Sequence, residues 1–226
     1  MVLNIASSTQ YQTKQKMVYH TLRHAIMHCK LQPGQRLVIE DIAQQLNVSP
    51  IPVREALQLL QSEGLTENIP HVGASVAPIS RDSVIEVFSL MEGLEVVASR
   101  LAVARLTPKA AQELAAIVAD MDEAVKQGDS ERWTDLNTRF HLSIARVTQM
   151  PMLQQMTSRA MDHWSRIRRY FFDQLRYSRM EQAQQEHHAM LDALTAGDYG
   201  QLEAVVKAHN QGALATYIEA LPSNGR

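Results

Sequence analysis

The chain has 226 residues, a hydrophobic content of 45% and a formal net charge of −2. This length is sufficient for two globular domains, and the charge excludes a nucleic-acid binder with a strongly basic overall composition. Because Cys29 is the only cysteine, no intramolecular disulfide can form, and a reducing compartment fits. The chain lacks a secretory leader pattern and any apolar run long enough to span a bilayer. These features predict a cytoplasmic protein with no membrane partner.

Three helices are predicted at the start of the chain. The first covers residues 11–30, and the second is a short amphipathic helix over residues 37–46. Asn47 follows where a left-handed residue would end the second helix. Ser49 is a natural N-cap for the third helix, over residues 48–64. This third helix has apolar residues at the spacing of one helix face, namely Val53, Ala56, Leu57 and Leu60.

Two short strands are predicted next, over residues 65–70 and 73–77, with a tight turn at His71 and Val72. Helices followed by such a hairpin form a winged helix-turn-helix, whose third helix enters the major groove of DNA by its N-terminal residues. Arg54 could contact a phosphate or fork onto guanine, although an ion pair with a nearby acid is the alternative. The predicted DNA-binding residues are Ser49, Ile51, Arg54, Gln58, His71 and Gly73.

A family resemblance supports this interpretation. The run Val-Ser-Pro-Ile-Pro-Val-Arg-Glu-Ala-Leu at residues 48–57, with Leu31-Gln32-Pro33-Gly34 before it and Gly73-Ala74-Ser75-Val76 after it, resembles the GntR family of bacterial transcription regulators. The similarity covers residues 14–78. Two residues depart from the family pattern, because Pro50 and Glu40 stand where the family has arginines that contact DNA. DNA binding is still expected, but the family's usual operator sequence is not.

From Asp82 onward the sequence is helical almost to its end. The predicted helices cover residues 83–105, 107–127, 130–148, 151–174, 178–196 and 198–221, and Asp82 and Ser130 are the expected caps of the first and third of these. Six helices of this length with short connections predict an antiparallel bundle. The overall prediction is a mainly α protein: a winged helix-turn-helix DNA-binding domain over residues 1–78, and an all-helical domain over residues 79–226, whose effector and metal binding the next residues predict.

Three histidines are predicted to meet inside this bundle. Asn137 and His141 are four residues apart on a helix face that is otherwise apolar, and His187 and His209 each share a stripe with aliphatic residues. A buried imidazole needs a partner for its ring nitrogens, and three imidazoles suit a divalent metal such as Zn²⁺ or Ni²⁺. We therefore predict a metal site formed by His141, His187 and His209, with a metal-free polar pocket as the alternative.

The helical part resembles the FCD effector-binding domain of the FadR branch of GntR regulators. The resemblance lies in Leu94-Glu95, residues 137–141, residues 186–194 and Ala208-His209. Metal-binding members of that family use an aspartate with three histidines, and Asn137 stands at the aspartate position here. The resemblance therefore implies Asn137 as a fourth ligand or an outer-shell donor.

Arginines are the residues expected to bind a carboxylate effector, because a guanidinium forks onto a carboxylate. Arg139 is the candidate for this contact. The arginines at 166, 168 and 169 are assigned to a solvated helix face. Met91 stands where the family often has an arginine that anchors the effector.

These observations predict a DNA-binding transcription regulator, a homodimeric repressor that binds a near-palindromic operator. Its bundle would bind a small metabolite, a carboxylate held in part by a divalent metal, and so modulate operator binding. Two alternatives remain at this stage. One is a metal-dependent, hydrolase-like enzyme that uses the histidine cluster to activate water. The other is an interaction module with weakened DNA binding, which Glu40 and Pro50 would explain.

Overall fold

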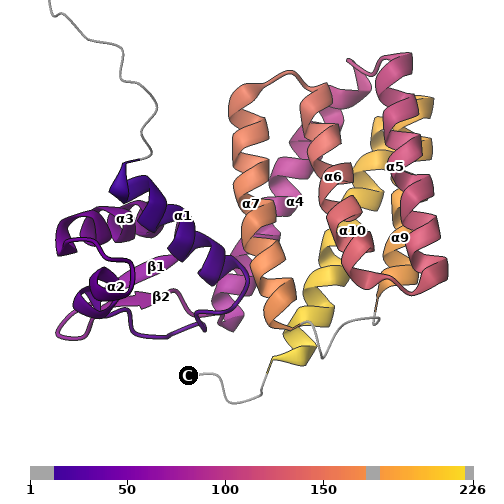
Figure 1. The fold of residues 1–226 in the computed structure, drawn as a ribbon. Helices are drawn as coiled ribbons and strands as arrows, with labels where there is room; N and C mark the ends of the chain where they lie inside the picture. The colour runs from indigo at the N-terminus through magenta and orange to yellow at the C-terminus, as the bar shows by residue number, and fades with distance from the viewer. Residues whose placement is uncertain (1–12, 172–178, 222–226) are drawn as a thin grey trace, which may run out of the picture. The chain divides into compact units, whose positions relative to one another are not determined.

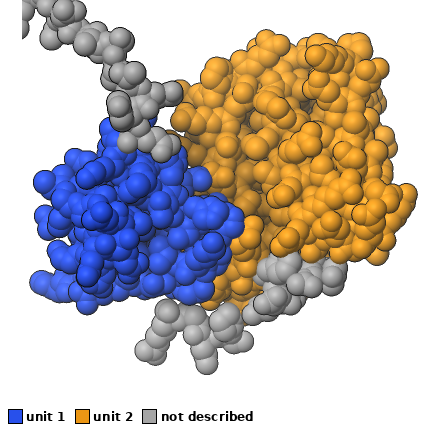
Figure 2. All heavy atoms as spheres, viewed as in Figure 1, with its two compact units in different colours: residues 1–78 blue, residues 79–226 orange. Residues whose placement is uncertain are grey.

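The structure, a computed structural model, describes residues 13–171 and 179–221 of the chain. The chain divides into two compact units, residues 1–78 and residues 79–226 (Figure 2). The first unit contains helices α1 (Lys14–Met27), α2 (Ile39–Gln45) and α3 (Pro50–Ser62) and strands β1 (Thr66–Ile69) and β2 (Gly73–Val76). The second contains helices α4 (Arg81–Val103), α5 (Pro108–Gln127), α6 (Ser130–Val147), α7 (Pro151–Tyr170), α9 (Met180–Ala196) and α10 (Tyr199–Ala220). The mainly α prediction is confirmed, and the predicted helical residues 172–174 and 178 lie outside the described part.

Helix α3 forms where its sequence favours a helix start and an apolar face. Ser49 takes the N-cap position with extended backbone, and Pro50 occupies the first helical position, where its missing N–H costs no hydrogen bond. Asn47 has a φ of 52°, the left-handed conformation expected after α2. The predicted stripe of α3 is buried, and its members Val53, Ala56, Leu57 and Leu60 pack with residues of α1 and β2 in one core.

The hairpin after α3 is the predicted wing. Strands β1 and β2 pair antiparallel, with Thr66 opposite Val76 and Ile69 opposite Gly73. His71 has a φ of 65° and Gly73 a φ of 95°, so the turn reverses the chain through two residues in the positive-φ region. Both residues are exposed at the tip of the hairpin. The three helices and this wing give the winged helix-turn-helix that the sequence predicted (Figure 1).

Two helices of the second unit begin at other caps than the sequence predicted. The N-cap of α4 is Ser80 instead of Asp82, because Ser80 and Ser83 form a reciprocal pair in which each side chain accepts from the other's backbone N–H, at 3.2 and 2.9 Å. The N-cap of α6 is Asp129 instead of Ser130, since the Asp129 carboxylate accepts from the N–H of Arg132 at 3.0 Å. In both cases the side chain that accepts from a first-turn N–H belongs to a residue one or two positions before the predicted cap.

The capping pair at the start of α4 gives a stability prediction. Replacing Ser80 by alanine removes one acceptor and leaves the N–H of Ser83 without its cap, so we expect the helical unit to lose about 1 kcal/mol of unfolding free energy. Urea denaturation followed by circular dichroism measures this loss. The matched control is Ser89→Ala, an exposed serine farther along the same helix. Equal stability of the two variants would show that the cap contributes nothing.

The second unit is an antiparallel helical bundle (Figure 1). It contains two apolar clusters. One cluster includes Leu114 and Met121 of α5 and Phe140 of α6. The other joins α4, α7 and α10 around Phe88 and Tyr217. Buried polar residues on α4, α6, α9 and α10 accompany these clusters, namely Glu95, Asn137, His141, Gln184, His187, His209 and Asn210. Among the described helices, none is both long and apolar enough to cross a membrane.

Candidate metal centre and ligand cavity

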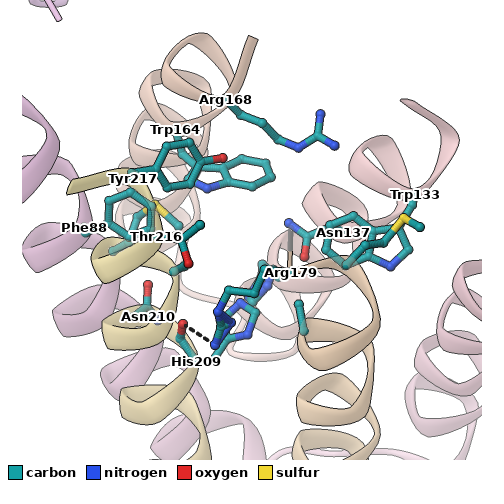
Figure 3. A pocket seen from close by; sticks show the side chains of 15 residues that line it. Phe88, Trp133, Asn137, Trp164, Arg168, Arg179, His209, Asn210, Thr216 and Tyr217 are labelled. Atoms are coloured by element: carbon teal, nitrogen blue, oxygen red, sulfur yellow. Dashed lines mark hydrogen bonds between the residues drawn. The ribbon is translucent and has the colours of Figure 1, made fainter. Parts of the chain in front are cut away.

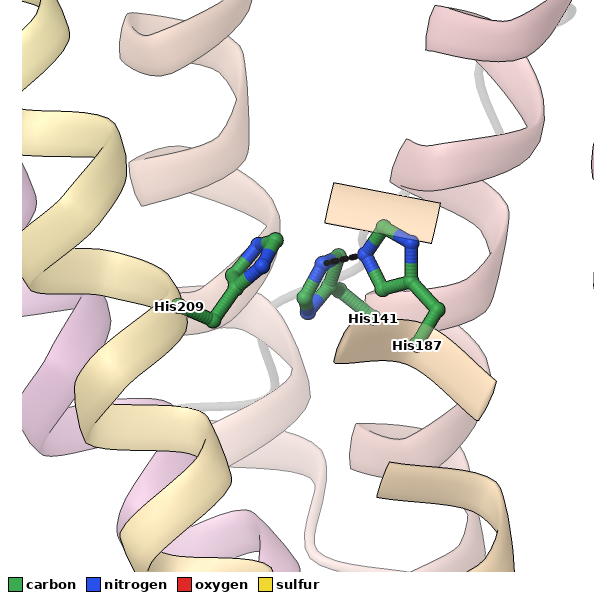
Figure 4. Close-up of side chains that lie close together, drawn as sticks. All are labelled: His141, His187 and His209. Carbon is green, nitrogen blue, oxygen red and sulfur yellow. Dashed lines mark hydrogen bonds between the residues drawn. The ribbon is translucent and has the colours of Figure 1, made fainter. Parts of the chain in front are cut away.

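The three predicted histidines meet in the interior of the bundle. His141 comes from α6, His187 from α9 and His209 from α10, and Figure 4 shows their rings facing one another. One ring nitrogen from each lies within 4.8 Å of the others, and all three residues are buried. The Nε2 atoms of His141 and His187 are 3.3 Å apart. The structure therefore places together the three side chains that the sequence assigned to one site.

Two carboxylates orient two of these rings. Glu95 Oε1 of α4 lies 2.9 Å from His141 Nδ1, and Glu186 Oε2 of α9 accepts from His209 Nδ1 at 2.7 Å. A carboxylate on one ring nitrogen holds the proton there and leaves the other nitrogen unprotonated for a metal. In both cases Nδ1 faces the carboxylate, so Nε2 is the nitrogen available to a metal. The second carboxylate oxygen of Glu95 accepts from Asn210 at 2.7 Å, which fixes its plane.

The spacing and protonation of the rings fit a divalent metal. A tetrahedral zinc with Zn–N bonds of about 2.0–2.1 Å separates its nitrogens by about 3.3–3.4 Å, which is the separation of the His141 and His187 nitrogens. Burial lowers the pKa of His187 well below its usual value, and the neighbouring histidines add to the effect, so the ring stays neutral as a ligand must. Burial also lowers the pKa of His209, although Glu186 opposes this shift.

The surroundings of the two carboxylates determine their charge. Burial by itself would raise the pKa of Glu95, but His141 and His209 outweigh it and the net shift is downward. Burial also raises the pKa of Glu186, but the contacts with His209 and Arg179 lower it by more, so the pKa lies below its usual value. Both groups therefore stay ionised near neutral pH. Glu95 places one negative charge beside the imidazoles, while the charge of Glu186 is paired with Arg179.

Asn137, the predicted fourth donor, is buried in the wall of the cavity. Its side chain is 3% exposed, and its Oδ1 atom is buried without a hydrogen-bond partner in the described part of the chain. Asn137, His141 and His209 line the same cavity. A buried carbonyl oxygen without a partner is costly, so this atom is suited to a metal or to a water bound there.

A cavity lies beside the histidines, between α4, α6, α7, α9 and α10, and is partly open to solvent (Figure 3). Its walls are mostly apolar, and the large side chains among them are Phe88, Met91, Trp133, Trp164, Met180 and Tyr217. The polar side chains in the wall are Asn137, His141, Arg168, Arg179, His209, Asn210 and Thr216. An apolar chamber with a few polar groups is the usual form of a small-molecule site.

The structure changes which arginines are candidates for effector contact. Arg139 is exposed and lies outside the residues that line the cavity, so the expected contact has no support. Arg168 and Arg179 line the cavity instead. The assignment of the 166–169 run to a solvated face was wrong for two of its members, because Arg166 is 4% exposed and Arg168 is half-buried. Arg168 shares a helix face with the buried Trp164 and Phe171.

The predicted DNA-binding residues of α3 and the wing are all exposed. The Ile51 side chain is 66% exposed, which is unusual for isoleucine and leaves it free to meet a thymine methyl. Ser49 makes no side-chain cap hydrogen bond, so its hydroxyl can still donate to a phosphate. Within residues 13–171 and 179–221, Arg54 has no ion pair, so the alternative of a salt bridge with a nearby acid finds no support.

Comparison with known proteins identifies the family. Residues 14–76 match the bacterial regulatory proteins of the gntR family, and residues 86–212, more than half of the chain, match the FCD domain. The chain belongs to the GntR family of transcription regulators, in the branch with an FCD domain. The resemblance found in the sequence is confirmed, and so is the assignment of the chain as a regulator that is not an enzyme.

Relatives of this GntR regulator match it over most of their length. The transcriptional regulator McbR of Escherichia coli is 29% identical over 80% of this chain and 82% of its own. A probable D-xylose utilization operon transcriptional repressor of Paenarthrobacter nicotinovorans is 30% identical over 82% of this chain and 79% of its own. The solved structure of E. coli McbR/YncC superposes with a TM-score of 0.73 at 27% identity, and covers 92% of this chain and 98% of that one.

Four residues of the site in this GntR regulator had no site role assigned from the sequence, and Arg168 among them was assigned to a solvated helix face instead. Glu95 was noted only as part of a family motif, although it interrupts the apolar stripe Val84, Phe88, Met91, Ala98 and Ala102, and an acid in such a stripe predicts a buried carboxylate. Glu186 is adjacent to His187 and therefore points to a different side of the helix, so its position in the sequence did not predict a contact with the histidines. Arg168 and Arg179 had no pattern that predicts a cavity-lining role.

Proposed function

We propose that this GntR regulator binds a near-palindromic operator as a homodimer and represses transcription until a carboxylate metabolite enters the cavity of its helical unit. A divalent metal held by His141, His187 and His209 forms part of the effector site. The observation that supports this most is the convergence of three buried imidazoles, two of them beside carboxylates, at a cavity that His141 and His209 line. A regulator with this site would act in the cytoplasm, where its DNA is.

DNA contact is proposed for the exposed residues of α3 and the wing. Ser49 and Arg54 lie in the first turns of α3, which is the part of a recognition helix that reaches base edges and phosphates. His71 and Gly73 at the tip of the wing would approach the backbone and the minor groove. The first unit has only a small positive charge, because six basic residues at 14, 16, 23, 30, 36 and 54 are opposed by five acids at 40, 41, 55, 63 and 67. One such unit would bind weakly, which favours a dimer.

The metal is proposed as zinc or nickel. Imidazole ligands suit both ions, and Asn137 would act as a fourth ligand or as a donor to a metal-bound water. When bound, the metal supplies a Lewis acid that can anchor a carboxylate. Glu95 and Glu186 hold the ring orientations, because a carboxylate oxygen of each lies within 2.9 Å of the Nδ1 atom of a ligand histidine.

A carboxylate effector is proposed from the character of the cavity. Arg168 places a guanidinium group on its wall, where Nη2 also donates to the backbone oxygen of Ser130 at 3.1 Å, and the opposing apolar surfaces suit a hydrocarbon or aromatic body. In Figure 3 the Arg168 side chain extends along the side of the cavity away from His209. An acid would therefore contact Arg168 through its carboxylate and the metal through a second polar group, with its apolar body among the aromatic side chains between them.

The proposal is tested by selecting bound DNA from a random pool with the full-length protein, and by measuring the affinity of the selected site with and without zinc and candidate acids. We expect an enriched near-palindromic sequence and an acid that lowers the affinity for it. A dimer that enriches no sequence would contradict DNA regulation and favour an interaction module. An enriched site whose affinity responds to no acid would contradict the effector part alone.

Replacement of Arg168 by glutamine is expected to weaken binding of the active acid by about tenfold, because a charge-assisted hydrogen bond contributes roughly 1.5–3 kcal/mol. Isothermal titration calorimetry on the metal-loaded protein measures the change. Arg139→Gln serves as the control, since Arg139 is exposed and lies outside the cavity. If Arg139→Gln reduces the affinity and Arg168→Gln does not, the cavity is not where the acid binds.

A further inference from the structure

The carboxylate that orients His209 is itself held by a forked arginine. Arg179 is the N-cap residue of α9, and its Nη2 atom donates to Glu186 Oε1 at 2.7 Å and to Oε2 at 2.9 Å. Nη1 adds a third contact to Oε2 at 3.2 Å. The side chains of Arg179 and Glu186 are only 11% and 17% exposed. A buried guanidinium that forks onto a carboxylate fixes the carboxylate plane, so Arg179 sets the direction in which Glu186 meets His209.

The space that Arg179 occupies depends on a glycine. Gly212 lies on α10, three residues after His209 and therefore on the same side of that helix. A Cβ atom at position 212 would lie 2.8 Å from the Cζ atom of Arg179, and closer still to Nη2. Cβ atoms do not approach other heavy atoms so closely, so any side chain at 212 must displace the guanidinium. Arg179 Nη2 also donates to the backbone oxygen of His209 at 3.4 Å, which places it against this stretch of α10.

Glycine at this point is not explained by the helix itself. The interior of a helix disfavours glycine relative to alanine, because glycine loses more backbone freedom on folding. The backbone at 212 is helical, outside the positive-φ region that would call for glycine. What a side chain would disturb there is the guanidinium of Arg179. Glycine at 212 therefore leaves the space that the guanidinium of Arg179 occupies.

We propose that Gly212 and Arg179 are positioning residues for the metal centre. Gly212 leaves space for the guanidinium, Arg179 fixes Glu186, and Glu186 holds the Nδ1 proton of His209 so that Nε2 stays directed at the metal. This inference rests on the proposed metal binding. It concerns His209 alone, because His141 is held separately by Glu95 and Asn210.

The first test is Gly212→Ala in the full-length protein, with zinc affinity measured by competition against a chromophoric chelator. We expect affinity to fall by about tenfold, at the lower end of the roughly 10- to 100-fold effect of losing an outer-shell partner. The melting temperature of the metal-free variant measures the effect on stability separately, because the gain in helix propensity from alanine opposes the cost of moving the guanidinium away from Glu186. Gly93→Ala in α4 is the matched control, since a Cβ there has nothing within 4 Å. Equal zinc affinity in both variants would overturn the proposal.

A double-variant cycle tests whether Gly212 acts through Arg179. Arg179→Ala should lower zinc affinity by about 10- to 100-fold, and adding Gly212→Ala to it should change nothing further, because no guanidinium is left to displace. If the two substitutions reduce zinc affinity independently, so that their fold-changes multiply, Gly212 does not act through Arg179. Arg179→Lys should resemble Arg179→Ala more than the wild type, since an ammonium group cannot fork onto Glu186.

Ring-nitrogen NMR of the metal-free protein gives a readout that does not depend on zinc. In the wild type His209 should be the Nδ1–H form, and Gly212→Ala and Arg179→Ala should both show the other tautomer appearing for His209 while His141 is unchanged. A His209 tautomer that is the same in all three proteins would overturn the proposal even if zinc binds. A wild type that shows the expected tautomers but binds no zinc would contradict the proposed metal site and leave the positioning contacts established.

Discussion

Protein purified without an affinity tag is expected to hold close to one divalent metal per chain, and His187→Ala to hold only a trace. His187 is fully buried and its Nε2 atom lies 3.3 Å from that of His141, so no other side chain can take its place without repacking. Loss of a direct ligand should exceed the roughly 10- to 100-fold cost of losing an outer-shell partner. Elemental analysis by mass spectrometry measures the metal content.

The neighbouring histidine provides the control for this experiment. His188 is exposed and its Nε2 atom lies 2.8 Å from Asp122 Oδ1, away from the cluster, so His188→Ala should keep the metal. His187→Gln is a second variant that fills more of the buried space, and circular dichroism checks that both His187 variants fold. Equal trace metal in the wild type and in His187→Ala would contradict the proposed metal site.

Arg54→Ala is expected to weaken operator binding by at least about 30-fold at fixed salt. Each arginine that contacts a base edge contributes about 1–3 kcal/mol, and a dimer on a near-palindromic site uses two, so the loss is at least about 2 kcal/mol. Fluorescence anisotropy on the selected operator measures the affinity. The matched control is Arg159→Ala, which removes an exposed arginine of α7 and the same charge.

The salt dependence of the Arg54 variant separates two kinds of contact. If Arg54 forks onto guanine, its loss should also relax the preference for one base in each half-site. If it contacts a phosphate, its loss should weaken binding to all sequences alike and reduce the slope of affinity against salt by about one unit per arginine. Unchanged affinity in Arg54→Ala would contradict the placement of α3 in the groove.

Local patterns predicted the elements of this chain well, because each depends on residues close together in sequence. The stripe of α3, the left-handed Asn47 and the two wing strands all follow from spacing and backbone preference. The helix starts at Ser80 and Asp129 were each misplaced, since Asp82 and Ser130 are also good caps. Which cap is used depends on acceptor geometry that composition does not show.

The sequence by itself determined the family, the helical organisation and the three histidines of the candidate site, since a histidine within an apolar stripe is expected inside. The tertiary structure decided the partners of those histidines: Glu95 lies 46 residues before His141 in the chain, and Glu186 lies 23 before His209. It also decided that Arg168 and Arg179, and not Arg139, line the cavity. The physical reason is that contacts between side chains on different helices depend on how the helices pack and rotate against one another, and residue spacing within one helix leaves that rotation undetermined.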